Sequence, residues 1–309
     1  MTAPFHLAGE AAGLAAAVLW AFSSLAWHLA SRRVGSVAVT TIRIAVATAA
    51  LVAVHRIVYG VPWPATMPLK AQWLLALSGM LGAGLGDLML FRSFLHIGPR
   101  LGLLTLSIAP ILTTLIAWFP PLRERLSVQV LAGIVMTVGG IAWAVSDGNA
   151  HPTITRDRRL FRRGVALALA GSCCIGVAFA VTKLGLRAAG AGQSFSGTLV
   201  RVAAATLFCL AALPVTGQVR ATARAFRDGR AMGIIAAGVV VGPILGIWLS
   251  LVAFDWAAAG VASTLVGTAP IMMIPMSRVV YGERPTWRGL TGTVVAVAGA
   301  AVLFLKAQS

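Results

Sequence analysis

Residues 107–140 read SIAPILTTLIAWFPPLRERLSVQVLAGIVMTVGG, and residues 266–299 read VGTAPIMMIPMSRVVYGERPTWRGLTGTVVAVAG. Each stretch holds an apolar run with an early proline, a turn containing Glu-Arg, and a second apolar run rich in glycine. Each run approaches the roughly 20 residues that a helix needs to cross the hydrocarbon core of a bilayer. The two stretches therefore predict the same pair of transmembrane helices in each half of the chain.

The composition extends this prediction to the whole chain. Of its 309 residues, 59% are hydrophobic and only 11% are charged, whereas a soluble domain carries about 25% charged residues. So few charges cannot cover a water-facing surface, so lipid must be the solvent for most of the chain. The sequence predicts an all-α integral membrane protein.

Reading for apolar runs of sufficient length gives ten expected transmembrane helices. They are Ala11–Ala30, Val37–Val58, Trp73–Ile97, Arg100–Phe119, Val128–Ser146, Gly164–Lys183, Ser196–Pro214, Met232–Phe254, Ala258–Val280 and Trp287–Leu305. The first has no basic segment before it and is followed by nine more, so we expect a span rather than a cleaved signal peptide. The longest polar stretch, Asp147–Arg163, divides the chain into two five-helix halves, residues 1–150 and 151–309.

The two halves resemble each other. Pro110 and Pro270 each lie between Ala and Ile, 160 residues apart, and Arg43 and Arg201 each lie between two β-branched residues. Gly82, Gly86 and Phe94 match Gly242, Gly246 and Phe254 at the same offset of 160. An odd number of spans per half inverts the second half relative to the first. Inverted repeats are a transporter architecture, with the solute site near the midplane between them.

Small residues recur at every fourth position in two expected spans. Gly238, Gly242 and Gly246 form one such row, and Ser78, Gly82 and Gly86 form the other. Small residues at this spacing let helix backbones approach closely within lipid. We therefore expect these faces to be helix contacts, with sliding during a transport cycle as the functional alternative.

The net charge of +17 lies mainly in short connectors, where phospholipid head groups are nearer anions than nucleic acid. The odd-numbered connectors hold 16 Lys and Arg residues against 7 in the even ones and the C-terminus. The positive-inside rule places the odd connectors in the cytoplasm and both termini outside. Arg220, Arg224 and Arg227 fall on one helical stripe, which indicates either a short helix on an anionic leaflet or a solvated loop.

Metal and disulfide chemistry find no support in the sequence. The cysteines Cys173, Cys174 and Cys209 all lie in apolar runs, and the first two are adjacent, which disulfide geometry disfavours. The five histidines are scattered without helical ligand spacing. The chain also lacks the Gly-x-x-x-x-Gly-Lys-Ser/Thr stretch of nucleotide-binding loops. We predict no metal and no cofactor.

The repeated motif resembles that of the drug/metabolite transporter superfamily, specifically its ten-helix EamA-type permeases. The pattern of proline helix, Glu-Arg turn and glycine-rich helix falls on Pro110, Glu124, Arg125, Gly133 and Gly140, and again on Pro270, Gly282, Glu283, Arg284, Gly292 and Gly299. The first turn departs from the pattern because it reads Pro120-Pro121-Leu122-Arg123 before Glu124 and lacks the glycine.

This resemblance implies a secondary transporter that exports or exchanges small metabolites, amino acids among them, through a central cavity between the two repeats. It implies no ATP hydrolysis and no enzyme activity. It also implies cytoplasmic termini, opposite to the charge count. We expect a multi-pass protein of a bacterial inner membrane, a monomer or weak homo-oligomer, whose partners are a small-molecule substrate and anionic phospholipids, without nucleic acid.

Asp87 is the one acidic residue deep inside an expected span. A carboxylate there costs about 2.5–3.5 kcal/mol on insertion scales, so such groups usually face a cavity or a partner. One interpretation is structural, as an ion pair or a neutral buried carboxyl. The other is a proton or cation site that couples transport.

Arg43 and Arg201 also lie inside expected spans. Arg43 is on the same half of the membrane as Asp87, so the two side chains can pair; the alternative is snorkelling to the head groups. Arg201 is on the opposite half, and Ile247 occupies the position equivalent to Asp87. An unpaired guanidinium suits a substrate carboxylate, which it binds in fork geometry; the alternative for Arg201 is again snorkelling to the head groups.

The remaining candidates are polar or ring-bearing residues within spans. Pro110 and Pro270 are expected in mid-helix, as hinges of the transport cycle or as static kinks. Ser107 and Thr268 beside them either add hydroxyls to a site or bond their own helix. Trp20, Ser23, Ser24 and Trp248 are candidates for stacking on and hydrogen bonding to a solute, or for packing.

Two other functions compete with a carrier. A membrane-embedded enzyme acting on lipid calls for clustered catalytic groups, and none occurs in or beside the spans. A passive channel for small solutes is the closer alternative, but the inverted repeat with paired prolines favours a carrier.

Overall fold

A computed structural model describes residues 3–118, 128–145, 157–190, 192–246, 249, 265, 268–282 and 286–304. Every regular element in these ranges is helical. In the first half they are α1 (Ala3–Val34), α2 (Ser36–Tyr59), α3 (Leu69–Gly79), η1 (Met80–Gly86), α4 (Asp87–Leu106), α5 (Ala109–Trp118) and α6 (Val128–Val145). In the second they are α7 (Arg158–Ala189), α8 (Ser194–Val215), α9 (Val219–Ala225), α10 (Gly229–Val239), η2 (Val240–Gly246), α13 (Ala269–Tyr281) and α14 (Trp287–Phe304).

Six helical stretches within these ranges are long and apolar enough to cross a membrane. They are Ala11–Val34, Ser36–Tyr59, Leu69–Thr113, Arg158–Ala189, Phe195–Val215 and Gly229–Gly246, and a shorter apolar helix covers Val135–Ala144. This confirms the all-α, multi-pass character expected from composition. The stretch Leu69–Thr113 contains parts of two expected spans, which separate at Gly98, whose φ of 75° is left-handed.

The expected span Arg100–Phe119 is not one continuous helix, which corrects the prediction. α4 ends at Leu106, a turn covers Ser107 and Ile108, and α5 begins at Ala109. Pro110 is therefore in the first turn of α5, and Pro270 is likewise in the first turn of α13 rather than in mid-helix. Proline favours this position because the first N–H groups of a helix have no partner within it.

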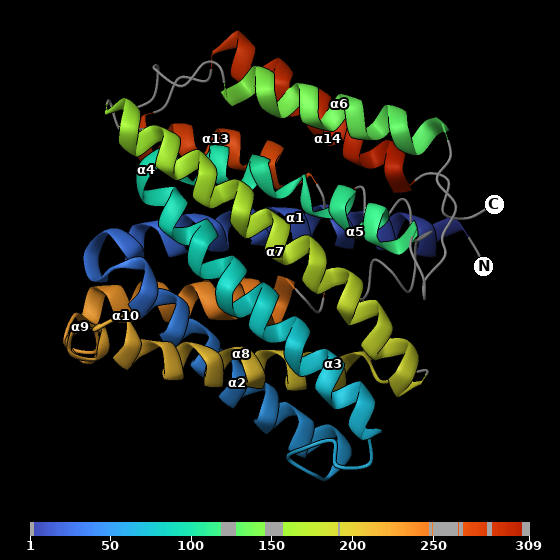
Figure 1. Ribbon diagram of the computed structural model, residues 1–309, viewed down its shortest axis with the longest axis vertical. Helices are drawn as coiled ribbons and strands as arrows, with labels where there is room; N and C mark the ends of the chain where they lie inside the picture. Colours follow the sequence, from blue (N-terminus) through green and yellow to red (C-terminus); the bar gives the residue numbers. More distant parts are fainter. Residues whose placement is uncertain are drawn as a thin grey trace.

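The first helix of each half packs mainly against the other half. α3, η1, α4 and α5 pack against α7, whereas α10, η2 and α13 pack against α1, and Figure 1 shows α7 crossing α3 and α4. The predicted rows of small residues lie at these contacts. A Cβ added at Gly82 would lie 2.9 Å from the Cβ of Ala178, and one at Gly242 would lie 2.4 Å from the Oγ of Ser23. Only glycine permits backbones to approach this closely.

Helices α6 and α14 form a close pair at the top of the molecule (Figure 1). A Cβ at Gly140 would lie 2.6 Å from the Gly292 carbonyl, and a Cβ at Gly299 would lie 2.8 Å from the Gly133 carbonyl. Between these contacts, the Thr137 hydroxyl donates to the Ala296 carbonyl at 3.3 Å. The partner's number falls as the residue number in α6 rises, so the two helices are antiparallel.

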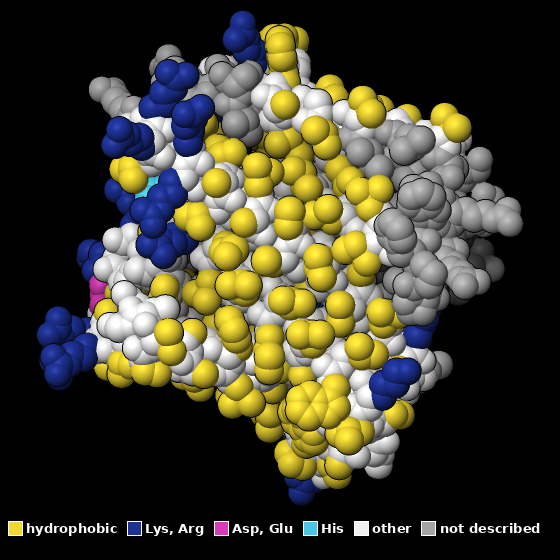
Figure 2. All heavy atoms as spheres, viewed as in Figure 1, with side chains coloured by type: hydrophobic (Ala, Val, Ile, Leu, Met, Phe, Trp, Pro, Cys, Tyr) yellow, Lys and Arg dark blue, Asp and Glu magenta, His cyan; other side chains and the backbone are white. Residues whose placement is uncertain are grey.

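The surface is divided between charged and apolar regions. In Figure 2, basic side chains gather along the left edge, and apolar side chains cover the broad middle. The same edge in Figure 1 holds α9 and the starts of α7 and α10, whereas α1 begins and α14 ends at the opposite edge. The helices therefore run broadly between these two edges, and the basic side chains near α9 and the starts of α7 and α10 gather at one of them.

Candidate functional site

Arg43 and Asp87 form an ion pair inside the helical bundle. The Nη2 atom of Arg43 donates a hydrogen bond to Oδ2 of Asp87. The side chain of Arg43 is 8% exposed and that of Asp87 is 21% exposed. The pairing that the sequence made possible is present, and it joins α2 to the first residue of α4.

Two aromatic rings enclose the guanidinium of Arg43. Its Cζ atom lies 4.9 Å from the ring centre of Trp27 and 4.6 Å from that of Phe91. A cation within about 6 Å of a ring centre is attracted to the face of the ring, more strongly where water is absent. Arg43 is thus held by charge and by rings, and it does not snorkel to the head groups. Sequence reasoning missed both rings because neither lies near Arg43 in the chain.

Arg201 of α8 lies close to this pair. A Cβ at Gly79 would lie 2.0 Å from the Arg201 carbonyl, and one at Gly82 would lie 3.9 Å from its Nη2 atom. The charge of Asp87 acts on Arg201 through space. Among the described residues Arg201 makes no ion pair, and its buried Nε atom has no hydrogen-bond partner. The cluster therefore holds two cations and one anion, and Arg201 is its less satisfied cation.

The backbone that carries Asp87 is unusual. η1 and η2 are π-helical turns over Met80–Gly86 and Val240–Gly246, at matching places in the two halves. Such turns are rare and frequently mark functional sites. Gly82 and Gly86 of η1 permit close packing on α7, where a Cβ at Gly86 would lie 2.7 Å from Ile175, and Gly84 faces Phe208 of α8. The repeated glycines were a visible signal, but nothing in their spacing distinguished a π-turn from an α-helix.

The other candidates lie at helix contacts or helix ends. Ser23 is buried and donates to the Leu19 carbonyl at 2.8 Å, while its Oγ atom faces Gly242. Trp20 faces Gly246 in the same interface, and Ser24 is buried. In the structure Trp20 and Ser23 join α1 to η2.

The residues before the two prolines lie at helix ends, Ser107 after α4 and Thr268 before α13. The hydroxyl of Thr268 donates to the Leu265 carbonyl at 2.6 Å, so Thr268 bonds its own segment. Ser107 is half-buried at the end of α4. Trp248 and the side chain of Pro110 lie outside the described residues.

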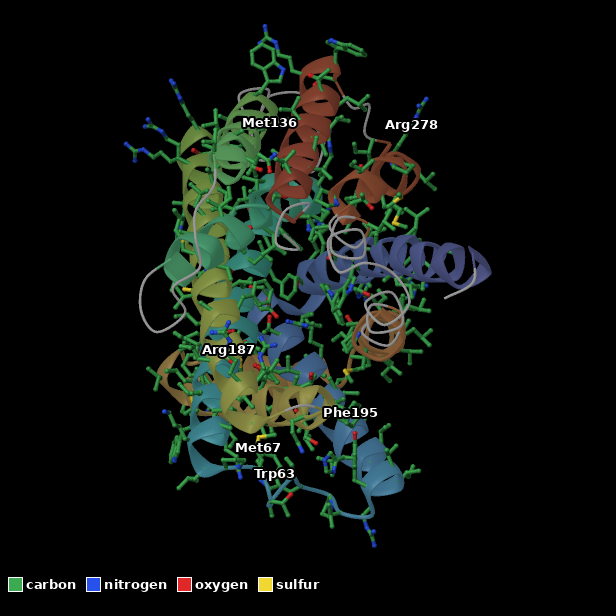
Figure 3. The ribbon with its side chains drawn as sticks, turned by 90° about the vertical axis from the view of Figure 1, so that its right-hand side faces the viewer. Trp63, Met67, Met136, Arg187, Phe195 and Arg278 are labelled. Carbon is green, nitrogen blue, oxygen red and sulfur yellow. The ribbon has the colours of Figure 1, made fainter. Side chains whose placement is uncertain are left out.

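A second polar network joins the two halves at the far end of α2. The Nδ1–H of buried His55 donates to the Val61 carbonyl at 2.7 Å, so Nε2 accepts from the Ser196 hydroxyl at 3.1 Å. The imidazole stacks on Phe195, with 6.1 Å between ring centres. Figure 3 shows Phe195 at the lower end of the molecule, near Met67 and Trp63. Sequence reasoning missed this network, since His55 has no patterned neighbour.

Comparison with known proteins identifies the relatives of this chain. The model of the EamA-like transporter family matches residues 7–146 and again residues 162–305. A curated protein of Streptantibioticus cattleyicolor, described as a probable terminal-alkyne amino-acid exporter, is 44% identical over 45 residues. That match spans 15% of this chain and 15% of the relative. A solved crystal structure, described only as that of a protein, shares the fold with a TM-score of 0.62 at 19% identity, over 97% of this chain and 98% of the other.

Proposed function

Because the chain belongs to the EamA-like transporter family, we propose that it is a secondary transporter that moves small organic solutes, amino acids among them, by alternating access. Members of this family are membrane transporters rather than enzymes. Export or exchange is the proposed direction, in keeping with the relative described as an amino-acid exporter. The observation that carries the proposed site is the cluster of Arg43, Asp87 and Arg201 inside the helical bundle.

We infer that the chain folds as ten transmembrane helices in two inverted repeats, residues 1–150 and 151–309. The antiparallel contacts between α6 and α14 support this inference. Gly140 meets Gly292 and Gly133 meets Gly299, and each of these contacts becomes the other when the halves are exchanged. Helices that are equivalent in the two halves then run in opposite directions, as an inverted repeat requires.

Arg201 is the proposed ligand for a substrate carboxylate. Its position beside Gly79 and Gly82 brings a cation to a narrow helix crossing, and its Nε atom is free of partners among the described residues. A guanidinium binds a carboxylate through two parallel N–H donors. Asp87, which Arg43 holds in place, is the proposed proton or cation site that couples transport.

The proposed movement uses the breaks in the helices. The π-turns η1 and η2 and the helix starts at Pro110 and Pro270 are places where a backbone lacks regular α-helical bonding. Such places absorb changes of angle at lower cost than an intact helix. Their occurrence in both halves gives two matched hinges for opening the cavity to either side.

The charges of the connectors support a proposed orientation. We propose a bacterial inner membrane, with the basic connectors in the cytoplasm and both termini outside. The protein would act as a monomer or weak homo-oligomer, with the solute and anionic phospholipids as its partners.

Counterflow in proteoliposomes tests the proposal. Proteoliposomes that contain the wild-type protein and are loaded with an unlabelled amino acid should show trans-stimulated uptake of the labelled amino acid. A passive channel does not show trans-stimulation. Arg201→Gln should lower this exchange by about tenfold to hundredfold, since a charge-assisted hydrogen bond contributes about 1.5–3 kcal/mol. Arg201→Lys should be intermediate because lysine keeps the charge but loses the fork.

The matched control is Arg278→Gln on α13, whose exposed side chain points outward in Figure 3. It should exchange like wild type. If none of the amino acids tested gives trans-stimulation, the proposed carrier function is wrong. If Arg201→Gln exchanges as fast as wild type, Arg201 does not bind the substrate carboxylate.

A further inference from the structure

A hollow opens where the end of α1 meets α9. Its volume is about 340 Å³, and it is lined by Arg33, Val34, Ala221, Arg224, Ala225 and Asp228. It lies apart from the Arg43–Asp87 pair, on the edge of the molecule where the basic side chains gather (Figure 2). The lining combines the charged residues Arg33, Arg224 and Asp228 with the apolar residues Val34, Ala221 and Ala225.

The charges of the hollow favour an anion. Arg33 donates from Nε to Asp228 at 2.9 Å and from Nη2 at 3.2 Å, so this pair is formed within the protein. Asp228 also accepts the backbone N–H of Ala231 at 3.0 Å. Arg224 makes no hydrogen bond or ion pair from its side chain among the described residues. Two guanidinium groups therefore face one carboxylate that is already occupied, and Arg224 is left to bind an external group.

The position of the hollow identifies the source of that anion. α1 ends a candidate span at Val34, and α9 lies between the candidate spans Phe195–Val215 and Gly229–Gly246. Short segments that close two spans lie at the depth of the phospholipid head groups. Val219 of α9 is 49% exposed and Phe226, the residue after α9, is 59% exposed, although neither lines the hollow. A short helix with arginines and exposed apolar groups is typical of one lying in the interface plane.

We propose that this hollow binds the phosphodiester head group of an anionic phospholipid, with Arg224 as the principal donor and Arg33 as the second. The phosphate oxygens accept from guanidinium N–H groups at short range. Free phosphate offers the same oxygens. The lipid source is favoured by the position of the hollow at the ends of candidate spans.

Lipid at this place joins the two halves of the protein. Arg33 ends α1, whereas Asp228 precedes α10, and α1 packs along α10. A phosphate bridging Arg33 and Arg224 strengthens the link between α1 and the second half. Because Asp228 competes with that phosphate for Arg33, it limits the affinity. Lipid binding at the hollow does not depend on which solute the protein moves.

The experiment uses full-length protein in a neutral detergent, with the melting temperature measured as lipid is added. Phosphatidylglycerol should raise the melting temperature more than the same mole fraction of phosphatidylcholine, because a ligand that binds the folded state stabilises it. In Arg224→Gln this excess should fall by more than half. The control Arg220→Gln removes an exposed arginine of the same helix that does not line the hollow, and it should keep the excess. Asp228→Asn should bind phosphatidylglycerol several-fold more tightly.

Three results would overturn the proposal. If Arg224→Gln and Arg220→Gln lower the excess rise in melting temperature equally, anionic lipid is attracted to the basic face in general and not to the hollow. An equal rise in melting temperature with inorganic phosphate or glycerol phosphate would show a free anion rather than a lipid. No excess for phosphatidylglycerol in well-folded wild-type protein would show that the hollow binds neither.

Discussion

Thr48 of α2 and Thr206 of α8 share a hydrogen bond of 2.8 Å between their hydroxyl groups, although 158 residues separate them. Arg43 and Arg201 are the same distance apart in the chain. The two threonines thus occupy matching places in the two halves and touch each other. Such a contact lies where a two-fold axis relates one half to the other, which is the relation that we propose for the two repeats. The contact lies one to two helical turns from the charged cluster.

The threonine pair should couple the stabilities of α2 and α8. Each hydroxyl also lies within hydrogen-bond distance of a carbonyl of its own helix, Ile44 for Thr48 and Val202 for Thr206. Since each hydroxyl has one hydrogen, one threonine donates to the other while the second donates to its own helix. Hydrogen bonds between membrane helices average about 0.6 kcal/mol in double-mutant cycles. We expect Thr48→Val, Thr206→Val and the double variant to give a coupling free energy of that order in reversible unfolding. Strict additivity of the two single effects would show that the contact contributes nothing.

The ion pair of Arg43 and Asp87 should behave as a unit. Arg43→Gln leaves a carboxylate in the bundle without its nearest cation, and we expect a loss of about 3 kcal/mol in the free energy of unfolding. The double variant with Asp87→Asn removes both charges and should recover much of that loss. Unfolding in mixed micelles measures both. If the double variant is less stable than wild type by the sum of the two single effects, the pair is not a coupled unit.

The antiparallel pair α6 and α14 offers a matched test of packing. A Cβ at Gly140 would lie 2.4 Å from the Ala296 nitrogen, whereas one at neighbouring Gly139 would meet nothing within 4 Å. Gly140→Ala should therefore destabilise the protein by about 1–3 kcal/mol through overpacking, while Gly139→Ala should be neutral or stabilise it by up to about 1 kcal/mol. Equal melting temperatures for the two variants would argue against this contact.

Asp228 should give the protein an acid-dependent term in its stability. The backbone N–H of Ala231 and then the Arg33 guanidinium lower the pKa of Asp228 below its ordinary value, which is about 3.9. The unfolded chain then binds the proton at higher pH than the folded chain. The contribution is complete above about pH 5 and is lost as the pH falls through and below about 4. The melting temperatures of wild type and Asp228→Asn should differ at pH 6 and converge near pH 3; a gap that stays constant would contradict this.

Much of the fold was readable from the chain. Low charge and long apolar runs predicted a helical membrane protein, because a bilayer admits only helices or closed barrels. The repeated proline and Glu-Arg pattern predicted the family. The rows at Gly82 and Gly242 predicted close helix contacts, and the structure places Ala178 and Ser23 against them. These features depend on local composition and spacing, which a sequence displays directly.

The charged site was readable only in part. Arg43, Asp87 and Arg201 stood out because charges within spans are rare. The rings of Trp27 and Phe91 around Arg43, and the contact of Arg201 with Gly79, did not stand out. They depend on which helices cross, and at what height. The mid-helix position expected for the prolines was wrong, since an apolar run does not reveal an internal turn such as Ser107–Ile108.

By itself the sequence determined that lipid surrounds most of this protein, that its helices are apolar transmembrane helices, which family it belongs to and which charges lie inside the bundle. Only the tertiary structure decided that α7 packs on the first half and α1 on the second, and that Thr48 meets Thr206. The physical reason is that lipid supplies no hydrophobic force between helices. Their partners are therefore chosen by the fit of glycine faces and by a few polar contacts between distant segments, which exist only after the helices have come together.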